Sequence, residues 1–429
     1  MSKLDELIAE LCPNGVEYKS LGEIATIARG GNFQKKDFCD RGVPCIHYGQ
    51  IYTKYGLFTD KTITFITEER AKKQKFAKTN DIIMAVTSEN IEDVCKCLAW
   101  LGNEDVAVSG HSAIISHNQN PKYLVYYFHS QMFFTQKRKL AHGTKVIEVT
   151  PDTLKSIKLP VPPLEVQREI VHILDSFTLL TAELTAELTA RKKQYEFYRD
   201  NLIKKEQHIS EVKKLADVAN IYDSLHQTPS YSNSGYSMVR VQDIKGGYLD
   251  EDKTLKVDES VWNLFTQKYT PRLNDIVVSR VGSYGNFALI PNDKCCLGQN
   301  VALIHPNINP KYLYHVLMST MTKQWINNNV KGASQKSFSL ADIKRVPVPV
   351  PKENIQQRIA EVLDNFEAIC TDLNIGLPAE IEARQKQYEY YRDLLLTFAE
   401  TGSTLMTDRQ TDRQTDRQTD RQTDRAERN

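Results

Sequence analysis

Two stretches of this sequence decide the fold: LPVPPLEVQREIVHILDSF at residues 159–177 and VPVPKENIQQRIAEVLDNF at residues 348–366. They have the same length and share their pattern of proline, glutamine and apolar residues, at an offset of 189 residues (348 minus 159). A second pair follows, RKKQYEFYRDNLI from Arg191 and RQKQYEYYRDLLL from Arg384, at an offset of 193 residues (384 minus 191). Self-similarity of this kind indicates that the chain is a tandem duplication.

The match continues upstream in fainter form. NPKYL occurs at Asn120 and Asn309, and the Asn-Asp-Ile-Ile run at Asn80 corresponds to Asn-Asp-Ile-Val at Asn274. VEYKSLGEIA at residues 16–25 corresponds to EVKKLADVA at residues 211–219. The chain is therefore a variable block and a helix block, each present twice. Two such copies can fold about a pseudo-two-fold axis and present two similar surfaces.

The helix blocks have the alternating three-four spacing of a coiled-coil seam. It predicts one helix over residues 164–204, roughly 60 Å long at about 1.5 Å per residue, starting after a proline-rich segment. TAELTAELTA at residues 181–190 repeats every four residues, so each unit adds about 6 Å of helix. In the second copy we expect a bend or turn at residues 376–378, Gly-Leu-Pro. The seam residues expected to build these spacer helices are Leu174, Phe177, Leu184, Leu188, Tyr195, Leu363, Phe366 and Tyr388. Tyr198 and Tyr391 are also expected to be packing residues.

The variable blocks contain short β-branched runs at residues 81–86, 112–116, 275–279 and 301–305, which predict strands. One shorter helix is expected after them in each block, over residues 122–140 and 311–328. NPKYL is interpreted as the start of that helix. The predicted fold class is α+β: two tandem-duplicated domains of mixed helix and sheet, separated by long antiparallel coiled-coil helices with pseudo-two-fold symmetry.

Composition limits the function classes. The chain has 429 residues, with 55 basic and 54 acidic side chains and a net charge of +1, so bulk charge alone does not hold nucleic acid. A local basic face stays possible. The first 15 residues carry several charges and no run approaches about 20 apolar residues, so we expect a cytoplasmic protein without membrane contact. The eight cysteines are expected to be reduced, and neither Cys95 with Cys97 nor Cys295 with Cys296 has zinc-site spacing, so no metal site is predicted.

No catalytic residues are predicted. The sequence lacks a GxxxxGK[ST] loop, a GxGxxG motif after a strand, HxH and HExxH. NPKYL is similar to the Asn-Pro-Pro-aromatic motif of amino-methyltransferases, but Lys122 and Lys311 replace the second proline. Pro151 and Asp152 form a Pro-Asp pair without the acidic-x-Lys triplet of a nuclease. We therefore expect no cofactor on this chain.

Glycine-containing polar loops in both variable blocks supply the side chains that read base edges and hold phosphates. The run EERAKKQKFAK at residues 68–78 is either a phosphate-binding strip or a solvated helix face, and we favour the solvated face. Candidate DNA contacts in the first block are Arg29, Asn32, Lys35, His47, Tyr48, Ser88, Asn90, His111, Thr144 and Lys145. Those in the second block are Ser224, Gln227, Arg240, Gln242, Arg280, Ser283, Tyr284, Gln299, Asn300, Lys331, Ser334, Gln335 and Lys336.

The helix-block motifs, their second copies and the TAEL repeat together resemble the specificity subunit of type I restriction-modification systems, closest to the IC group. The resemblance covers residues 1 to about 400 and implies that each variable block is a target recognition domain reading one half of a bipartite double-stranded DNA site. It implies that the helices set the spacer between the halves. It also implies two modification subunits, which are adenine methyltransferases using S-adenosylmethionine, and two restriction subunits using ATP and Mg. The implied parts are a conserved segment (1–15), target recognition domain 1 (16–157), a central helix (158–205), target recognition domain 2 (206–346), distal helices (347–400) and a tail (401–429).

Two other readings stay open: a helical scaffold that does not touch DNA, and a divergent adenine methyltransferase. The tail repeats TDRQ from Thr407 and is expected to be disordered. A repeated GACA tetranucleotide would encode this unit, so slippage and phase variation are a hypothesis about the gene.

Overall fold

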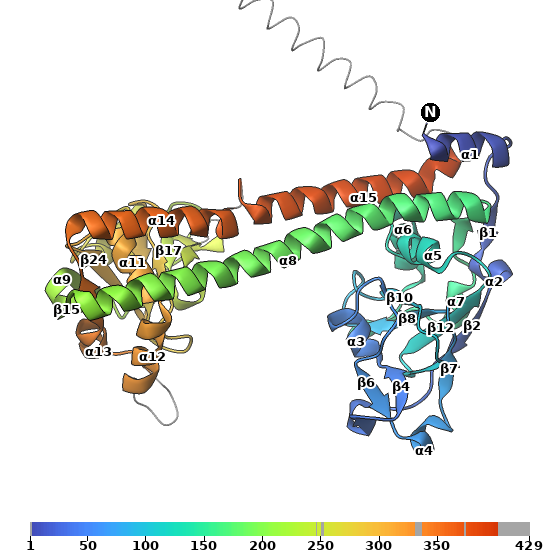
Figure 1. The fold of residues 1–429 in the computed structure, drawn as a ribbon, viewed down its shortest axis with the longest axis horizontal. Coiled ribbons are helices and arrows are strands. Elements are labelled where there is room, and N and C mark those ends of the chain that lie inside the picture. The colour runs from blue at the N-terminus through green and yellow to red at the C-terminus, as the bar shows by residue number, and fades with distance from the viewer. Residues whose placement is uncertain (1, 246, 250–252, 331–336, 373–374, 402–429) are drawn as a thin grey trace, which may run out of the picture. The chain divides into compact units, whose positions relative to one another are not determined.

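The computed structural model describes residues 2–245, 247–249, 253–330, 337–372 and 375–401 (Figure 1). Four predicted DNA contacts, Lys331, Ser334, Gln335 and Lys336, and the predicted tail after residue 401 lie outside this range. The chain divides into two compact units. Unit 1 comprises Met1–Glu183 with Glu382–Asn429, and unit 2 comprises Leu184–Ile381.

Unit 1 contains two five-stranded sheets, with strand orders β2-β12-β8-β10-β5 and β3-β6-β4-β11-β7. The first sheet consists of β2 (Ala25–Arg29), β12 (Ser112–His117), β8 (Ile82–Ala85), β10 (Cys97–Trp100) and β5 (Phe58–Thr59). The second consists of β3 (Phe38–Cys39), β6 (Thr64–Ile66), β4 (Val43–Ile46), β11 (Val106–Val108) and β7 (Lys75–Ala77). Two-stranded pairs join β1 (Tyr18–Ser20) to β14 (Lys158–Pro160) and β9 (Thr87–Ser88) to β13 (Ile147–Glu148).

Unit 2 repeats this arrangement with fewer strands. Its larger sheet has the order β16-β24-β21-β22 and consists of β16 (Ala219–Asp223), β24 (Val301–Pro306), β21 (Ile276–Ser279) and β22 (Phe287–Leu289). Its smaller sheet has the order β20-β17-β23 and consists of β20 (Leu255–Val257), β17 (Tyr236–Val239) and β23 (Cys295–Leu297). The remaining pairs are β18 (Ile244–Lys245) with β19 (Tyr248–Leu249) and β15 (Glu211–Lys214) with β25 (Pro347–Val350).

The strand pairings show that the duplication extends to the topology. In unit 1, β12 is antiparallel to both β2 and β8, and in unit 2, β24 is antiparallel to both β16 and β21. In the other sheets, β4 is parallel to β11 and β17 is parallel to β23. The four predicted strands correspond to β8, β12, β21 and β24 within one residue at each end.

The long helices agree with the prediction in outline. Helix α8 (Leu164–Ile209) begins at the predicted residue and ends five residues later, so its 46 residues give about 69 Å. An interruption is present but lies earlier than the predicted residues 376–378, because α14 (Glu353–Thr371) ends at Thr371 and α15 (Leu377–Thr401) already includes Leu377 and Pro378. Proline fits there because it is tolerated in the first turn of a helix. In unit 1, Phe177 stacks on Tyr391 at 5.2 Å between ring centroids. In unit 2, Tyr198 lies 5.6 Å from Phe366, although 43% of Tyr198 is exposed.

One predicted helix in each block is wrong, because two shorter helices form instead. Residues 122–140 contain α5 (Pro121–Phe128) and α6 (Gln131–Leu140), and residues 311–328 contain α11 (Pro310–Met318) and α12 (Thr320–Asn329). The break falls at Ser130 and Ser319. Each hydroxyl donates to the carbonyl three residues earlier and accepts from the N–H three residues later, so the serine caps a new helix.

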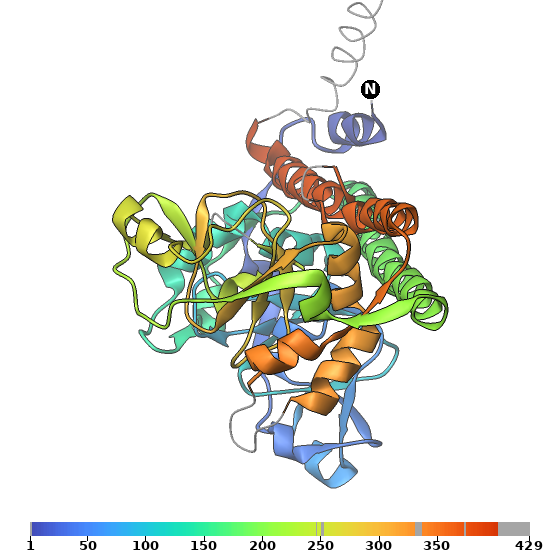
Figure 2. The same cartoon turned by 90° about the vertical axis from the view of Figure 1, so that its left-hand side faces the viewer.

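The remaining short helices lie between the strands. In unit 1 they are α1 (Lys3–Leu11), α2 (Leu21–Ile24), η1 (Lys35–Asp37), α3 (Tyr48–Thr53), α4 (Glu68–Ala71) and α7 (Pro151–Leu154). In unit 2 they are α9 (Leu215–Val218), η2 (Val241–Asp243), α10 (Glu259–Phe265) and α13 (Leu340–Arg345). Figure 2 shows α10, in yellow, at the edge of unit 2. Trp262 and Phe265 of α10 pack on the smaller sheet.

Two smaller predictions also have outcomes. The run at residues 68–78 is not one helix, because α4 ends at Ala71 and the chain then enters β7.

All eight cysteines are free thiols, and seven are buried. Cys295 and Cys296 are neighbours on β23 and therefore face opposite sides, each in a different apolar cluster. Among the described residues, no helix is long and apolar enough to cross a bilayer.

A matched set of polar contacts fastens each variable domain to its helix block. In unit 1, Gln167 of α8 accepts from the backbone N–H of Asn120 and donates to Pro162 O. In unit 2, Gln356 of α14 makes the same two contacts, with Asn309 and Pro351. Asn120 and Asn309 also cap α5 and α11, which confirms NPKYL as a helix start. We call these contacts the glutamine lock.

Candidate nucleic-acid interface

A hollow lies in each unit where two parallel strands end. In unit 1, β4 runs into His47 and α3, while β11 runs into the loop at residues 109–111. In unit 2, β17 runs into Arg240 and η2, while β23 runs into the loop at residues 298–300. Parallel strands end at the same edge of a sheet, so the two loops that follow them meet there.

The unit 1 hollow has a volume of about 660 Å³. It brings together five of the predicted DNA contacts: Arg29, Asn32, His47, Tyr48 and His111. It is also lined by Gly30, Gly31, Phe33, Gln34, Lys73, Lys75, Ser109 and Gly110, which were not among the predicted contacts. The predicted contacts Lys35, Ser88, Asn90, Thr144 and Lys145 do not line it.

The unit 2 hollow has a volume of about 370 Å³. It also brings together five predicted contacts: Arg240, Gln242, Ser283, Gln299 and Asn300. Thr228, Pro229, Tyr231, Val241 and Gly298 complete the lining and were not predicted. Gln227 is exposed next to this lining, and Ser224, Arg280 and Tyr284 lie outside it.

Three predicted contacts of unit 2 lie outside the hollow. Arg280 forms an ion pair with Asp223 and is 14% exposed. Tyr284 packs against the main apolar cluster of unit 2. Ser224 is 4% exposed, and its hydroxyl has no hydrogen-bond partner among the described residues.

The two hollows occupy equivalent places in the duplicated fold. His47 and Arg240 are 193 residues apart and stand at the same point, directly after β4 and β17. Each of their backbone N–H groups donates to the side chain three residues later, His47 to Gln50 and Arg240 to Asp243, both at 3.0 Å. The backbone scaffold is therefore shared while the side chains that line it differ.

Aromatic rings form one wall of the unit 1 hollow. Tyr48 lies 4.5 Å from His47 and 4.9 Å from His111, between ring centroids. Burial, together with the nearby Lys35 and His111, lowers the pKa of His47 to about 4. His47 is therefore neutral at pH 7. Its Nδ1 accepts from Gly49 N at 3.2 Å, so the ring proton is on Nε2 and is a donor.

Cations line the same hollow. Lys73 and Lys75 are both exposed, and no carboxylate forms an ion pair with either among the described residues. Arg29 is held by Glu148 at 2.6 Å and donates from Nε to Gly110 O at 2.9 Å. Two exposed lysines suit phosphate oxygens, and one guanidinium held by Glu148 suits a base edge.

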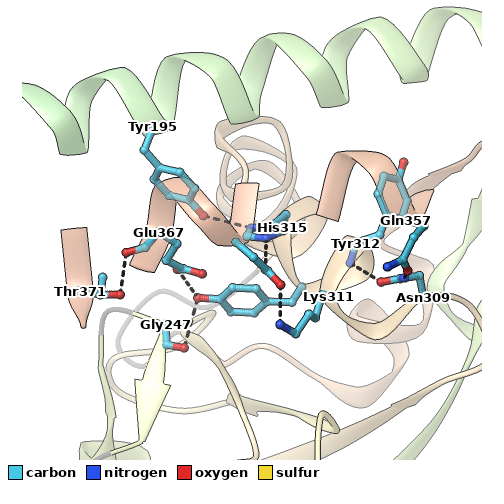
Figure 3. Close-up of polar contacts among 11 residues, drawn as sticks. Tyr195, Gly247, Asn309, Lys311, Tyr312, His315, Gln357, Glu367 and Thr371 are labelled. Carbon is cyan, nitrogen blue, oxygen red and sulfur yellow. Dashed lines mark hydrogen bonds and ion pairs between the residues drawn. The ribbon is translucent and has the colours of Figure 1, made fainter. Parts of the chain in front are cut away.

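One cluster in unit 2 has the chemistry of metal ligands. His315, Asp364 and Glu367 have ligand atoms within 4.8 Å of one another (Figure 3). However, His315 Nε2 is hydrogen-bonded to Asp364 at 2.8 Å, its Nδ1 to the Tyr195 hydroxyl at 3.0 Å, and Lys311 pairs with Asp364. These bonds occupy both ring nitrogens of His315 and pair Asp364 with a lysine.

Unit 1 has an equivalent cluster without the imidazole. Lys122 pairs with Asp175 at 2.6 Å, and the Tyr126 hydroxyl donates to the same carboxylate at 2.7 Å. Tyr126 and Thr178 stand 189 residues before His315 and Glu367. Because a phenol and a hydroxyl replace the imidazole and the carboxylate, the shared role is hydrogen bonding at the junction of α5 or α11 with its helix block.

Comparison with known proteins identifies the architecture. The model of the family described as Type I restriction modification DNA specificity domain matches twice, at residues 13–191 and 209–383. The chain is 36% identical over 258 residues to the Escherichia coli type I restriction enzyme EcoR124I/EcoR124II specificity subunit, an alignment that covers 57% of this chain and 63% of that protein. It is 29% identical over 313 residues to the Haemophilus influenzae putative specificity subunit S.HindORF215P, covering 70% and 77%.

Among solved structures, a chain from work on complex assembly and conformational transition of the type I R-M system matches with a TM-score of 0.54. The alignment covers 90% of this chain and 98% of that chain at 16% identity. This likeness shows that the fold is shared.

Proposed function

This chain belongs to the family of type I restriction-modification DNA specificity domains, and from that premise we propose that it selects the DNA sequence for such a system, each unit reading one half of a bipartite site. The observation that carries this proposal is the pair of hollows. They stand at equivalent places of two copies of one fold, yet their side chains differ, as recognition of two different half-sites requires.

The chemistry of the hollows fits duplex DNA. Amide, imidazole, hydroxyl and guanidinium groups are the ones that read base edges in the major groove. Lys73 and Lys75 add sequence-independent attraction to phosphates. Unit 1 thus combines positioning contacts with reading contacts, whereas the hollow of unit 2 supplies reading contacts.

Catalysis in this proposal belongs to partner subunits. Two modification subunits would carry S-adenosylmethionine, and two restriction subunits would carry ATP and Mg. The net charge of +1 fits a chain that shares its hold on DNA with partners. The spacer between the half-sites would follow the length of α8.

The two alternative readings have less support. A scaffold without DNA contact does not account for two polar hollows at matched places. A divergent methyltransferase would need NPKYL as a catalytic motif, whereas both copies of that motif cap a helix and take part in the glutamine lock.

The proposal is tested by replacing residues 16–157 with the corresponding segment of a relative of different specificity. Methylated motifs are then mapped across the genome of a host that carries the chain and its modification partner. We expect one half of the motif to change and the other half and the spacer to stay. A motif that changes in both halves, or methylation independent of this chain, contradicts the proposal.

A further inference from the structure

Arg240, Gln242 and Asp243 form one hydrogen-bonded group in the unit 2 hollow. The Arg240 guanidinium donates from Nε to Asp243 Oδ2 at 2.9 Å and from Nη2 to Asp243 Oδ1 at 3.0 Å. The carboxylate is nearly buried, with 8% of the Asp243 side chain exposed, against 23% for Arg240. A bidentate pair of this kind fixes the plane of the guanidinium.

The fixed guanidinium in turn sets the orientation of the Gln242 amide. With Oε1 toward Arg240, this oxygen accepts from Nη1 at 2.9 Å and from Nη2 at 2.7 Å. The opposite orientation would place the NH₂ group against guanidinium donors, so the network assigns the amide as stated. Both hydrogen bonds occupy the oxygen, and Gln242 is left with only N–H donors to offer a ligand.

A donor-only glutamine discriminates between purines. A free glutamine reads adenine with both amide atoms, because Oε1 accepts from N6 while Nε2 donates to N7. Guanine instead presents two adjacent acceptors, N7 and O6, in the major groove. Gln242 is exposed at the hollow, where a base edge can reach it.

We propose that Gln242 reads a guanine in the half-site of unit 2 and that Arg240, held by Asp243, is the positioning residue that prevents Gln242 from accepting adenine. This inference rests on the proposed function and deepens it. It concerns unit 2 alone, because the equivalent positions in unit 1, at an offset of 193 residues, are His47, Gly49 and Gln50.

The test uses the full chain with its modification partner in a host whose methylated motifs are mapped. The variants are Gln242→Ala, Arg240→Met and Arg240→Lys, and the matched control is Gln267→Ala, an exposed glutamine of the same unit outside the hollow. For the unaltered chain we expect a guanine at one position of the unit 2 half-site. Gln242→Ala should reduce the preference for guanine there by about 5- to 100-fold, the range for loss of one good base contact.

Both Arg240 variants should instead accept guanine or adenine at that same position. The guanidinium donates two hydrogen bonds to Asp243 and two to the Gln242 amide oxygen, and neither methionine nor lysine can form all four. Arg240→Lys keeps the positive charge, so it separates positioning from charge. Gln267→Ala should leave the motif unchanged.

The inference is overturned if Gln242→Ala leaves every base preference intact, or if the Arg240 variants lower methylation without admitting adenine. In either case a bipartite motif that still depends on this chain leaves the proposed function standing. If the unaltered chain directs no methylation, the proposed function itself fails.

Discussion

At the residue scale, the difference between a predicted and an observed contact depends on partners far away in the sequence. Arg29 and Arg280 both lie in glycine-containing polar stretches of the sequence and are predicted alike. Arg280 pairs with Asp223, 57 residues away, and lies outside the hollow, whereas Arg29 pairs with Glu148 and still lines the hollow. Composition indicates which side chains can contact DNA, but the tertiary fold decides which of them reach a hollow.

Lys73 and Lys75 line the hollow of unit 1 but are not among the predicted DNA contacts. The basic run at residues 68–78 was interpreted as a helix face, and a helix would have spread its lysines around an axis. Because the chain enters β7 instead, both lysines lie at one hollow. The sequence contains no clear signal for this strand, because three residues, Lys75–Ala77, are too few to show an alternation of polar and apolar side chains.

We predict that Lys73→Ala and Lys75→Ala weaken DNA binding by the complex without changing the bases it selects. Each lysine neutralises about one phosphate, so each change should lower the slope of log K against log salt by roughly one. The measurement is a salt titration of binding to a cognate and to a non-cognate duplex. Lys72→Ala is the control, since Lys72 is exposed but lies outside the hollow. Loss of affinity for the cognate duplex alone would contradict a phosphate role.

At the element scale, the helices were the most predictable part of the chain. The start of α8 and the break between α14 and α15 follow from proline and glycine, whose effects on the backbone are local. The division into α5 and α6 was missed because it depends on Ser130, a 2% exposed serine that caps a helix only in its folded surroundings.

We predict that inserting one TAEL unit at residues 181–190 lengthens the spacer of the DNA site and leaves both half-sites unchanged. Helix α8 is continuous through this repeat, and four residues add about 6 Å, which is one to two base pairs at about 3.4 Å each. Mapping of methylated motifs measures the result. A variant of equal length, with Thr185 and Thr189 replaced by alanine, should keep the original spacer. Altered bases in either half-site would refute this ruler role.

At the scale of the whole molecule, the two units differ in their response to acid. Burial, with a smaller contribution from Arg392, Lys137 and Lys96, lowers the pKa of His129 to about 4. Burial likewise lowers the pKa of His117. Both residues belong to unit 1, as does His47. In unit 2, burial raises the pKa of Glu367. Its contribution to the stability of the folded state therefore increases as the pH falls.

We therefore predict that unit 1 loses stability as the pH falls from about 6.5 toward 4. A histidine whose folded pKa lies below its unfolded value binds its proton more tightly in the unfolded state, so its contribution is complete above pH 6.5 and declines below it. For His129 alone the loss should be about 2 kcal/mol at pH 5.

Hydrogen exchange of peptides from each unit, at pH 7.5 and pH 5 and corrected for intrinsic rates, measures the effect. His129→Asn should reduce the pH dependence of unit 1 and leave that of unit 2 as it was. Equal pH dependence of unit 1 in both proteins would argue against this origin.

This chain must keep a stable fold and must vary the side chains of its hollows, and the glutamine lock shows that these two requirements depend on different residues. The contacts of Gln167 and Gln356 hold each variable domain to its helix block and are the same in both copies. The hollows lie elsewhere, and their first positions, His47 and Arg240, keep one backbone pattern under different side chains. Substitutions there leave the contacts of the glutamine lock in place. Mutational drift can therefore explore new target sequences at little cost in foldability, which makes this architecture highly evolvable.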